Sequence, residues 1–192
     1  MQRLPYEGTP TYYTLMLTNL EVHRMFEKMI RGWFAKSRGG LPAFAEAVLW
    51  GDEEGMEQKL NDLMLKTMSS FDGGNQPSSR LPENFYHGLV LGLLTSDSLE
   101  SYLVKSNRES GYGRYDVMLE PKDPDDPASI LEFKVFNARR EKTLEDTAAN
   151  ALRQIDEKKY ENDLVNRGIP AENIRKYGLA FRGKDCLIRM SS

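Results

Sequence analysis

The sequence lacks the features that would place the protein in a membrane or in an oxidising compartment. It contains one cysteine, Cys186, in 192 residues, so no disulfide can form within the chain. The apolar run around this cysteine, DCLIRM, is typical of a small buried core side chain. No run of about 18 apolar residues is present, so we expect no membrane span. These absences predict a cytoplasmic protein.

The first residues and the net charge exclude little more. MQRLPYEGTP lacks the apolar core of a signal peptide. It leads directly into TPTYYTLMLTNLEV, a pattern typical of the interior of a protein, so we expect the chain to be a fragment of a longer one. The formal net charge of −3 disfavours a non-specific nucleic-acid coat. It does not exclude an enzyme that touches a few phosphates.

Apolar periodicity predicts a helical first part. After a short strand over 11–17, we expect helices over 20–34, 41–52 and 53–71. The last of these carries an apolar side that we interpret as core, formed by Met56, Leu60, Leu63, Met64 and Met68. The stretch over 72–82 is rich in Gly, Pro, Ser and Asn and predicts a boundary. We therefore expect a helical junction or subdomain over 1–78 and a second domain over 79–192.

The pattern changes after the predicted boundary. We expect a helix over 82–96, three strands over 99–107, 114–120 and 130–136, and a long helix over 143–166. A final strand pair, KYGLAF and DCLIRM, lies around RGKD. The polar, proline-rich segment PKDPDDPAS is acidic, but we interpret it as a hairpin connection and not as a metal site.

Two of these strands carry charges inside otherwise apolar runs. Strand side chains alternate between two faces, so Asp116 in RYDVMLE points away from its apolar face, which is formed by Tyr115, Val117 and Leu119. Glu132 and Lys134 share one face of ILEFKVF. In an antiparallel hairpin the three charged side chains can meet on one side of the sheet. Two carboxylates brought together attract a cation such as Mg²⁺, and the lysine could orient or deprotonate a water bound to it or neutralise a phosphate oxygen.

The same charges have an ordinary structural interpretation. A one-sided antiparallel sheet alternates apolar and polar residues, and a cross-strand salt bridge on a wet face is worth about 0.2–1 kcal/mol. Two features favour an enclosed site instead. Ile130 and Phe136 lie on the same face as Glu132 and Lys134, and amphipathic helices precede and follow the strands. Both faces of the sheet can then be covered, and unpaired charge there would be costly.

The spacing of these residues resembles a known signature. Asp116 followed by Glu132-Phe133-Lys134 is similar to the D…E-x-K motif of the PD-(D/E)XK nucleases. Tyr115 stands where the superfamily name has proline. The resemblance implies a restriction-endonuclease-like α/β fold, with an α-β-β-β-α-β core and a mixed sheet flanked by helices, preceded by a small helical subdomain.

The flanking segments narrow the resemblance. ENFYHGLVLGLL, ALRQIDEKKY and LTNLEVHRMFEKMIRGWF are similar to a nuclease-like domain that follows an AAA-ATPase-like domain in many bacterial proteins of unknown role. The phosphate-cradling G-x-x-x-x-G-K-[ST] is missing from this sequence. If the full protein uses ATP, the ATPase-like domain is expected outside these residues.

The resemblance implies a role for each matching position. Asp116, Glu132 and the backbone carbonyl of Phe133 would hold Mg²⁺ or Mn²⁺. Lys134 would act on the attacking water. Glu83, on the first core helix, would hold a water bound to the ion or a second ion. Its alternative is an acid that only favours a helix N-terminus.

Other residues would surround this centre. Gln154 would line the site and contact substrate or water, or it is a surface glutamine. Lys158 and Arg114 would bind a phosphate, or they are solvated charges. His87 lies one helical turn from Glu83 and is interpreted as a structural histidine. Further basic residues that could guide a nucleic-acid backbone are Arg108, Arg139, Arg140 and Lys142.

The sequence therefore predicts a Mg²⁺-dependent nuclease that hydrolyses phosphodiester bonds through an Asp…Glu-x-Lys site, with DNA favoured as substrate. The alternative is a catalytically silent nuclease-fold module that binds nucleic acid or protein and is regulated by the ATPase domain. A third possibility is that the helical first part works as an oligomerisation or docking surface. Expected partners are nucleic acid, the upstream AAA-ATPase-like domain and a second copy in a homodimer. No membrane partner is expected.

Overall fold

The fold is that of a computed structural model, which describes residues 40–68, 83–94, 99–106, 109–110 and 113–191. These residues all belong to one compact unit, Lys36–Ser192. The strand expected over 11–17, the helix expected over 20–34 and Arg108 lie outside the described residues. No helix among the described residues is long and apolar enough to cross a bilayer.

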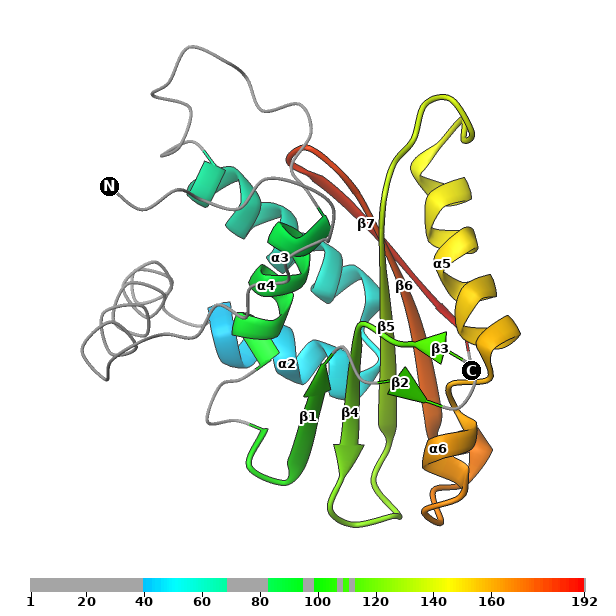
Figure 1. The fold of residues 1–192 in the computed structure, drawn as a ribbon. Helices are drawn as coiled ribbons and strands as arrows, with labels where there is room; N and C mark the ends of the chain where they lie inside the picture. The colour runs from blue at the N-terminus through cyan, green and yellow to red at the C-terminus, as the bar shows by residue number, and fades with distance from the viewer. Residues whose placement is uncertain (1–39, 69–82, 95–98, 107–108, 111–112, 192) are drawn as a thin grey trace, which may run out of the picture. The chain divides into compact units, whose positions relative to one another are not determined.

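A five-stranded mixed sheet forms the centre of the unit, in the order β1-β4-β5-β6-β7 (Figure 1). The strands are β1 (Tyr102–Ser106), β4 (Val117–Pro121), β5 (Ala128–Val135), β6 (Ile174–Arg182) and β7 (Asp185–Ser191). The β5–β6 pair is parallel, and the other three pairs are antiparallel. Parallel neighbours need a long crossover, which the chain makes through the helix that follows β5.

Helices cover both faces of the sheet (Figure 1). On one face lie α2 (Gly40–Trp50), α3 (Glu53–Met68) and α4 (Glu83–Leu94). On the other lie α5 (Leu144–Lys158) and the short α6 (Asn162–Val165), and a single 3-10 turn, Ala171–Asn173, leads into β6. The expected α/β fold with a mixed sheet flanked by helices is confirmed.

The apolar side predicted for α3 is buried. Met56, Leu60, Leu63 and Met64 are all core residues, while the side chain of Met68 lies outside the description. Although α2 and α3 precede the boundary predicted at residue 78, they pack on the same sheet. The boundary itself stays a prediction.

A close approach between β6 and α5 positions the second helical layer. A Cβ atom built on Gly178 would lie 2.4 Å from the carbonyl oxygen of Ala148 on α5, so only glycine fits there. Gly178 is the register partner of Glu132 on β5. The glycine therefore lets α5 lie directly over the part of the sheet that carries this acid.

The long helix expected over 143–166 is divided in the structure, which corrects the sequence prediction. α5 begins with a capping box between Thr143 and Asp146 and ends at Lys158. Lys159 follows in the left-handed conformation, with φ of 50°. This turn sends Tyr160 into the core, where it is 1% exposed. The apolar periodicity puts Tyr160 on one side of a continuous helix, so periodicity alone conceals the break.

The strand expected over 114–120 is also interrupted. A small ribbon, β2 (Glu109–Ser110) with β3 (Gly113–Arg114), was not predicted, and it ends two residues before a bend at Asp116. Because of this bend, Tyr115 packs in the α5-side cluster with Met118. The prediction that Tyr115 shares the face of Val117 and Leu119 is therefore wrong.

Candidate active site

Asp116 and Glu132 lie opposite each other where the β4–β5 ladder ends. The last register pair is Val117 with Leu131. Continuing the antiparallel register by one residue sets Asp116 against Glu132. Glu132 is 2% exposed, whereas Asp116 is partly exposed. The acidic connection between β4 and β5 lies at the other end of these strands, with residues 122–126 exposed, as expected for a polar hairpin loop.

The Asp116 side chain takes the place of the missing ladder partner. Its Oδ2 accepts a hydrogen bond of 2.8 Å from the backbone N–H of Phe133. In an antiparallel strand the N–H and C=O of one residue point to the same side. The carbonyl of Phe133 therefore points to the side on which Asp116 lies, as the predicted set of metal ligands requires.

His87 on α4 contacts the backbone at the Asp116 bend, from the face of the sheet that α4 covers. Its Nε2 lies 3.2 Å from the carbonyl oxygen of Asp116 and 2.9 Å from Oγ of Ser106. The imidazole ring is 5.7 Å from the ring of Phe133. These contacts agree with the interpretation of His87 as a structural histidine, which holds the backbone of the candidate ligand Asp116.

Glu132 has one satisfied oxygen and one that is not. Its Oε1 accepts hydrogen bonds from Nζ of Lys134, at 3.1 Å, and from Nε2 of Gln154. Its Oε2 is buried and has no hydrogen-bond partner among the residues that the structure describes. A buried carboxylate oxygen without a partner is costly. A cation placed between Glu132 and Asp116 would satisfy it.

The electrostatics of the acids reflect their crowding. Burial, and next the charge of Asp116, raise the pKa of Glu132 to about 7, although Lys134 opposes the shift. Burial also raises the pKa of Asp116, against the hydrogen bond from Phe133 and the charge of Lys134. Both carboxyls therefore release their protons less readily than usual. This is the behaviour of acids that burial removes from water, where the charge of Lys134 does not fully offset the cost of ionisation.

Glu83, the first residue of α4, is exposed but lies within electrostatic range of the site. Desolvation raises the pKa of Glu83, Lys134 lowers it, and Asp116 raises it. The structure thus brings Glu83 toward the same centre as the strand residues, although no hydrogen bond joins it to them. Its predicted role stays a prediction.

A hydrogen-bonded chain behind the site includes a residue that the sequence does not indicate. The hydroxyl of Tyr160 donates to the carbonyl of Arg114 at 2.6 Å. Nε2 of Gln154 lies 3.4 Å from the same hydroxyl and also donates to Glu132. Gln154 therefore faces the site and is not a surface glutamine. Tyr160 holds it there, and no feature of the sequence distinguishes this tyrosine from an ordinary core aromatic.

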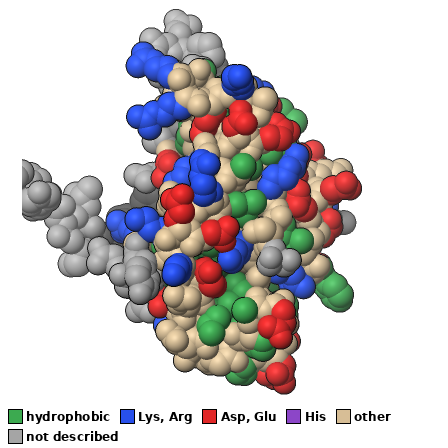
Figure 2. Space-filling view, turned by 90° about the vertical axis from the view of Figure 1, so that its right-hand side faces the viewer, with side chains coloured by type: hydrophobic (Ala, Val, Ile, Leu, Met, Phe, Trp, Pro, Cys, Tyr) green, Lys and Arg blue, Asp and Glu red, His purple; other side chains and the backbone are tan. Residues whose placement is uncertain are grey.

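Two of the predicted basic residues, Arg114 and Lys158, lie at the β3 ribbon near the site. The charge of Arg114 lowers the pKa of Asp116, so Arg114 is close to the acids. A Cβ on Gly113 would meet Cδ of Lys158 at 3.0 Å, which places the Lys158 side chain against the β3 ribbon. Figure 2, which views the α5 side, shows acidic and basic side chains interspersed on this face.

The donor set of the site can be compared with what a divalent ion requires. Among the described residues, no group of three or more His, Cys, Asp or Glu side chains is arranged to hold a metal. The predicted set is smaller, since it consists of two carboxylates and the backbone carbonyl of Phe133. It still fits a hard ion, because Mg²⁺ is commonly held by one or two carboxylates and keeps several waters. The unpaired Oε2 of Glu132 supports this assignment.

Comparison with known families identifies the class of protein. Residues 81–190 match the PD-(D/E)XK nuclease superfamily. The match covers more than half of the sequence, and the chain belongs to this superfamily, as its D…E-x-K spacing indicated. Superfamily members are usually nucleases and generally use divalent metal ions. No curated protein matches the sequence, and the association with an AAA-ATPase-like domain stays a prediction.

Proposed function

We propose that this protein is a metal-dependent nuclease that hydrolyses phosphodiester bonds of nucleic acid, with DNA as the favoured substrate and Mg²⁺ or Mn²⁺ as the ion. The observation that carries the proposal is the unpaired Oε2 of buried Glu132, opposite Asp116 and with Lys134 at 3.1 Å. Oε2 of Glu161 is also buried without a partner, so the support for an ion comes from the missing partner of Glu132 together with the position of this acid beside Asp116 and Lys134.

Each site residue would have a distinct task in the reaction. Asp116, Glu132 and the carbonyl of Phe133 would hold the ion, which when bound supplies Lewis-acid activation of water and of the scissile phosphate. Gln154 would keep Glu132 in its orientation through the observed hydrogen bond. Lys134 would orient the attacking water or take up its proton, and its charge would stabilise the transition state in a partly enclosed site.

The direct test is cleavage by the purified chain with Mg²⁺ or Mn²⁺. We expect cleavage of DNA that EDTA abolishes, and a loss of at least about a hundredfold in Asp116→Ala, since charge stabilisation at such a site is worth this much or more. Asp126→Ala, an exposed acid in the distant β4–β5 loop, is the matched control. Cleavage that persists in Asp116→Ala would contradict the proposal.

Metal titration separates the enzyme from a silent module. An active site of this kind should give heat of binding, and a thermal shift, with Mn²⁺ in the absence of nucleic acid. A module that only binds nucleic acid or protein would show neither. Running RNA beside DNA in the cleavage assay tests the substrate preference at the same time.

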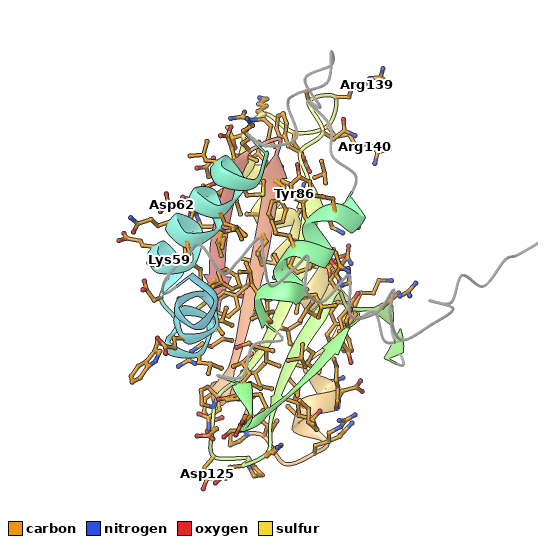
Figure 3. All side chains as sticks on the ribbon, turned by 90° about the vertical axis from the view of Figure 1, so that its left-hand side faces the viewer. Lys59, Asp62, Tyr86, Asp125, Arg139 and Arg140 are labelled. Atoms are coloured by element: carbon orange, nitrogen blue, oxygen red, sulfur yellow. The ribbon has the colours of Figure 1, made fainter. Side chains whose placement is uncertain are left out.

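The turn after β5 is suited to contact the substrate backbone. The carboxylate of Glu141 accepts from the N–H of Asn137 at 3.0 Å, from Thr147 at 2.8 Å and from Asn150 at 2.7 Å. This clamp orders a turn whose side chains Arg139 and Arg140 are exposed and project from the end of the molecule (Figure 3). We infer that these ordered, exposed guanidiniums, which follow the β5 strand that carries Glu132 and Lys134, bind backbone phosphates of the substrate.

Charge reversal tests this role of the two arginines. Arg139→Glu/Arg140→Glu is expected to raise KM for DNA by about tenfold or more with little change in kcat, because phosphate binding contributes mainly to affinity. The slope of log KM against log salt should fall by about 0.9 for each phosphate that the variant no longer neutralises. Lys59→Glu/Lys122→Glu changes the net charge equally at two exposed lysines elsewhere. Equal effects in both variants would show that only net charge matters.

A further inference from the structure

β7 is the last strand of the sheet, and its outer edge has no strand neighbour among the described residues. Residues along such an edge alternate, with every second N–H and C=O pointing outward. Unpaired edge groups are a template for pairing with another chain. In this protein the outward N–H groups of Cys186, Ile188 and Met190 nevertheless have side-chain partners.

Side chains of α3 accept hydrogen bonds from these β7 N–H groups in a regular order. Oε2 of Glu53 accepts from the N–H of Met190 at 3.0 Å, and Oε2 of Glu57 accepts from the N–H of Ile188 at 3.1 Å. Asn61 bonds to Cys186 twice: its Oδ1 accepts from the N–H at 2.7 Å and its Nδ2 donates to the carbonyl at 2.9 Å. Three α3 side chains at four-residue intervals thus bond the three outward N–H groups and the Cys186 carbonyl, while the Ile188 carbonyl accepts from Nη1 of Arg189 at 2.7 Å.

The match follows from the dimensions of the two elements. Four helical residues rise about 6.0 Å, and two residues of an antiparallel strand rise about 6.8 Å. A helix beside a strand can therefore present one side chain to each outward-facing residue over a short distance. Glu53, Glu57 and Asn61 meet β7 in reverse order, as the residues of an antiparallel sixth strand would.

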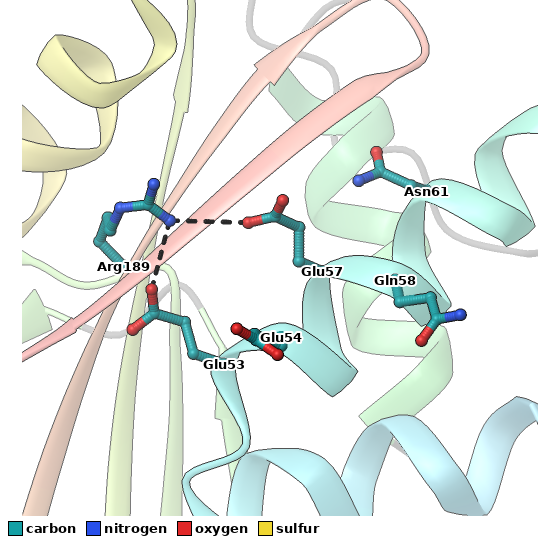
Figure 4. A pocket seen from close by; sticks show the side chains of 6 residues that line it. All are labelled: Glu53, Glu54, Glu57, Gln58, Asn61 and Arg189. Carbon is teal, nitrogen blue, oxygen red and sulfur yellow. Dashed lines mark hydrogen bonds and ion pairs between the residues drawn. The ribbon is translucent and has the colours of Figure 1, made fainter.

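An arginine on β7 reinforces the arrangement. Arg189 lies 3.2 Å from Glu53 and 3.7 Å from Glu57 on α3, and 3.6 Å from Glu145 in the first turn of α5. Figure 4 shows its guanidinium between the two α3 acids, at one side of a surface pocket of about 460 Å³. The positive charge of the guanidinium balances the two α3 carboxylates that bond to the β7 edge.

We propose that α3 is an edge cap: its Glu53/Glu57/Asn61 side chains substitute for a sixth strand and prevent β7 from pairing with a second copy of this chain. The segment that precedes the superfamily match at residues 81–190 would thus keep the nuclease sheet monomeric. The second copy is the partner that fits, because without the α3 side chains it would present the same unpaired β7 edge. Two antiparallel β7 strands would then pair around a twofold axis at Ile188.

The test compares two triple variants of the full chain. Glu53→Ala/Glu57→Ala/Asn61→Ala removes the hydrogen bonds between the α3 side chains and the β7 edge. The control Glu54→Ala/Gln58→Ala/Asp62→Ala also removes two acids and one amide. Each of these residues lies one position further along α3 and makes none of the hydrogen bonds to β7 described above. Light scattering is expected to show a concentration-dependent dimer for the first variant and a monomer for the second. A monomeric first variant would overturn the proposal.

A single substitution covers the case in which the triple variant does not fold. In Glu57→Ala, hydrogen exchange at the Ile188 amide should accelerate by about tenfold, the effect of losing one hydrogen bond of about 1.4 kcal/mol. Exchange at the Leu187 amide, which faces β6, should stay unchanged. An unaltered rate at Ile188 would show that the α3 side chain does not protect the edge.

Discussion

Replacing Glu132 with glutamine is expected to stabilise the protein and to eliminate metal binding and cleavage together. The folded-state pKa of Glu132, about 7, lies above its ordinary value of 4.5. Between these pH values the folded protein holds a proton that the unfolded chain has released, so the free energy of unfolding falls as the pH rises. Above about pH 7 the full cost is present, up to about 3 kcal/mol at 1.36 kcal/mol per unit.

Glutamine removes this cost because it has no charge to desolvate, while its Oε1 can still accept from Lys134 and Gln154. The gain in stability should be largest near pH 8 and should vanish toward pH 4, where Glu132 is protonated in both states. Urea denaturation at the two pH values measures it. Glu157→Gln, an exposed acid on α5, is the control and should change little at either pH.

The same substitution that raises stability is expected to lower metal binding and cleavage. A neutral amide is a poor ligand for a hard divalent ion, so Mn²⁺ should no longer raise the melting temperature of the Glu132→Gln variant, and cleavage should fall by about a thousandfold. A variant that is more stable and equally active would show that Glu132 is only a strained core acid. It would remove the main support for the metal site.

Replacing Lys134 with alanine is expected to abolish cleavage while preserving the metal site. The charge of Lys134 lowers the pKa of Glu132, so its loss should raise that pKa further. Protons would then compete better with the ion, and Mn²⁺ binding should weaken at pH 7 and recover at pH 9. Cleavage should stay about a thousandfold below that of the wild type at both pH values, because the group that we propose to act on the water is gone.

Lys134→Arg is the matched variant for this experiment. It keeps the positive charge, so metal binding at pH 7 should be restored. An arginine does not release its proton in proteins, so cleavage should stay low if Lys134 transfers a proton and should recover if only its charge matters. Wild-type cleavage by Lys134→Ala at pH 9 would contradict the role of this residue in the reaction.

The part of the site that follows from local periodicity could be predicted from the sequence. Glu132 and Lys134 share one face of β5 because strand side chains alternate, and that rule needs no knowledge of distant contacts. Asp116 lies at a bend before β4, so alternation alone does not explain its position. The two covered faces of the sheet followed equally well from the amphipathic helices. In both cases the information lies within a few consecutive residues.

The parts that depend on distant partners could not be predicted. Tyr160 fits a helical apolar pattern, and only its hydrogen bond to Arg114, 46 residues away, shows why the helix ends before it. At the bend, the Asp116 carboxylate bonds the Phe133 amide and its carbonyl contacts His87, and no strand pattern indicates either contact. The edge contacts of α3 with β7 join residues more than 120 positions apart.

The close packing at Gly178 gives the site a requirement that no catalytic residue reveals. Gln154 reaches Glu132 only because α5 lies close to the sheet. The helix can lie this close because residue 178 is glycine and has no Cβ atom. A larger side chain there would lift the helix and withdraw the amide from the acid that it orients. The hydrogen bond between Gln154 and Glu132 thus depends on Gly178 on the neighbouring strand β6.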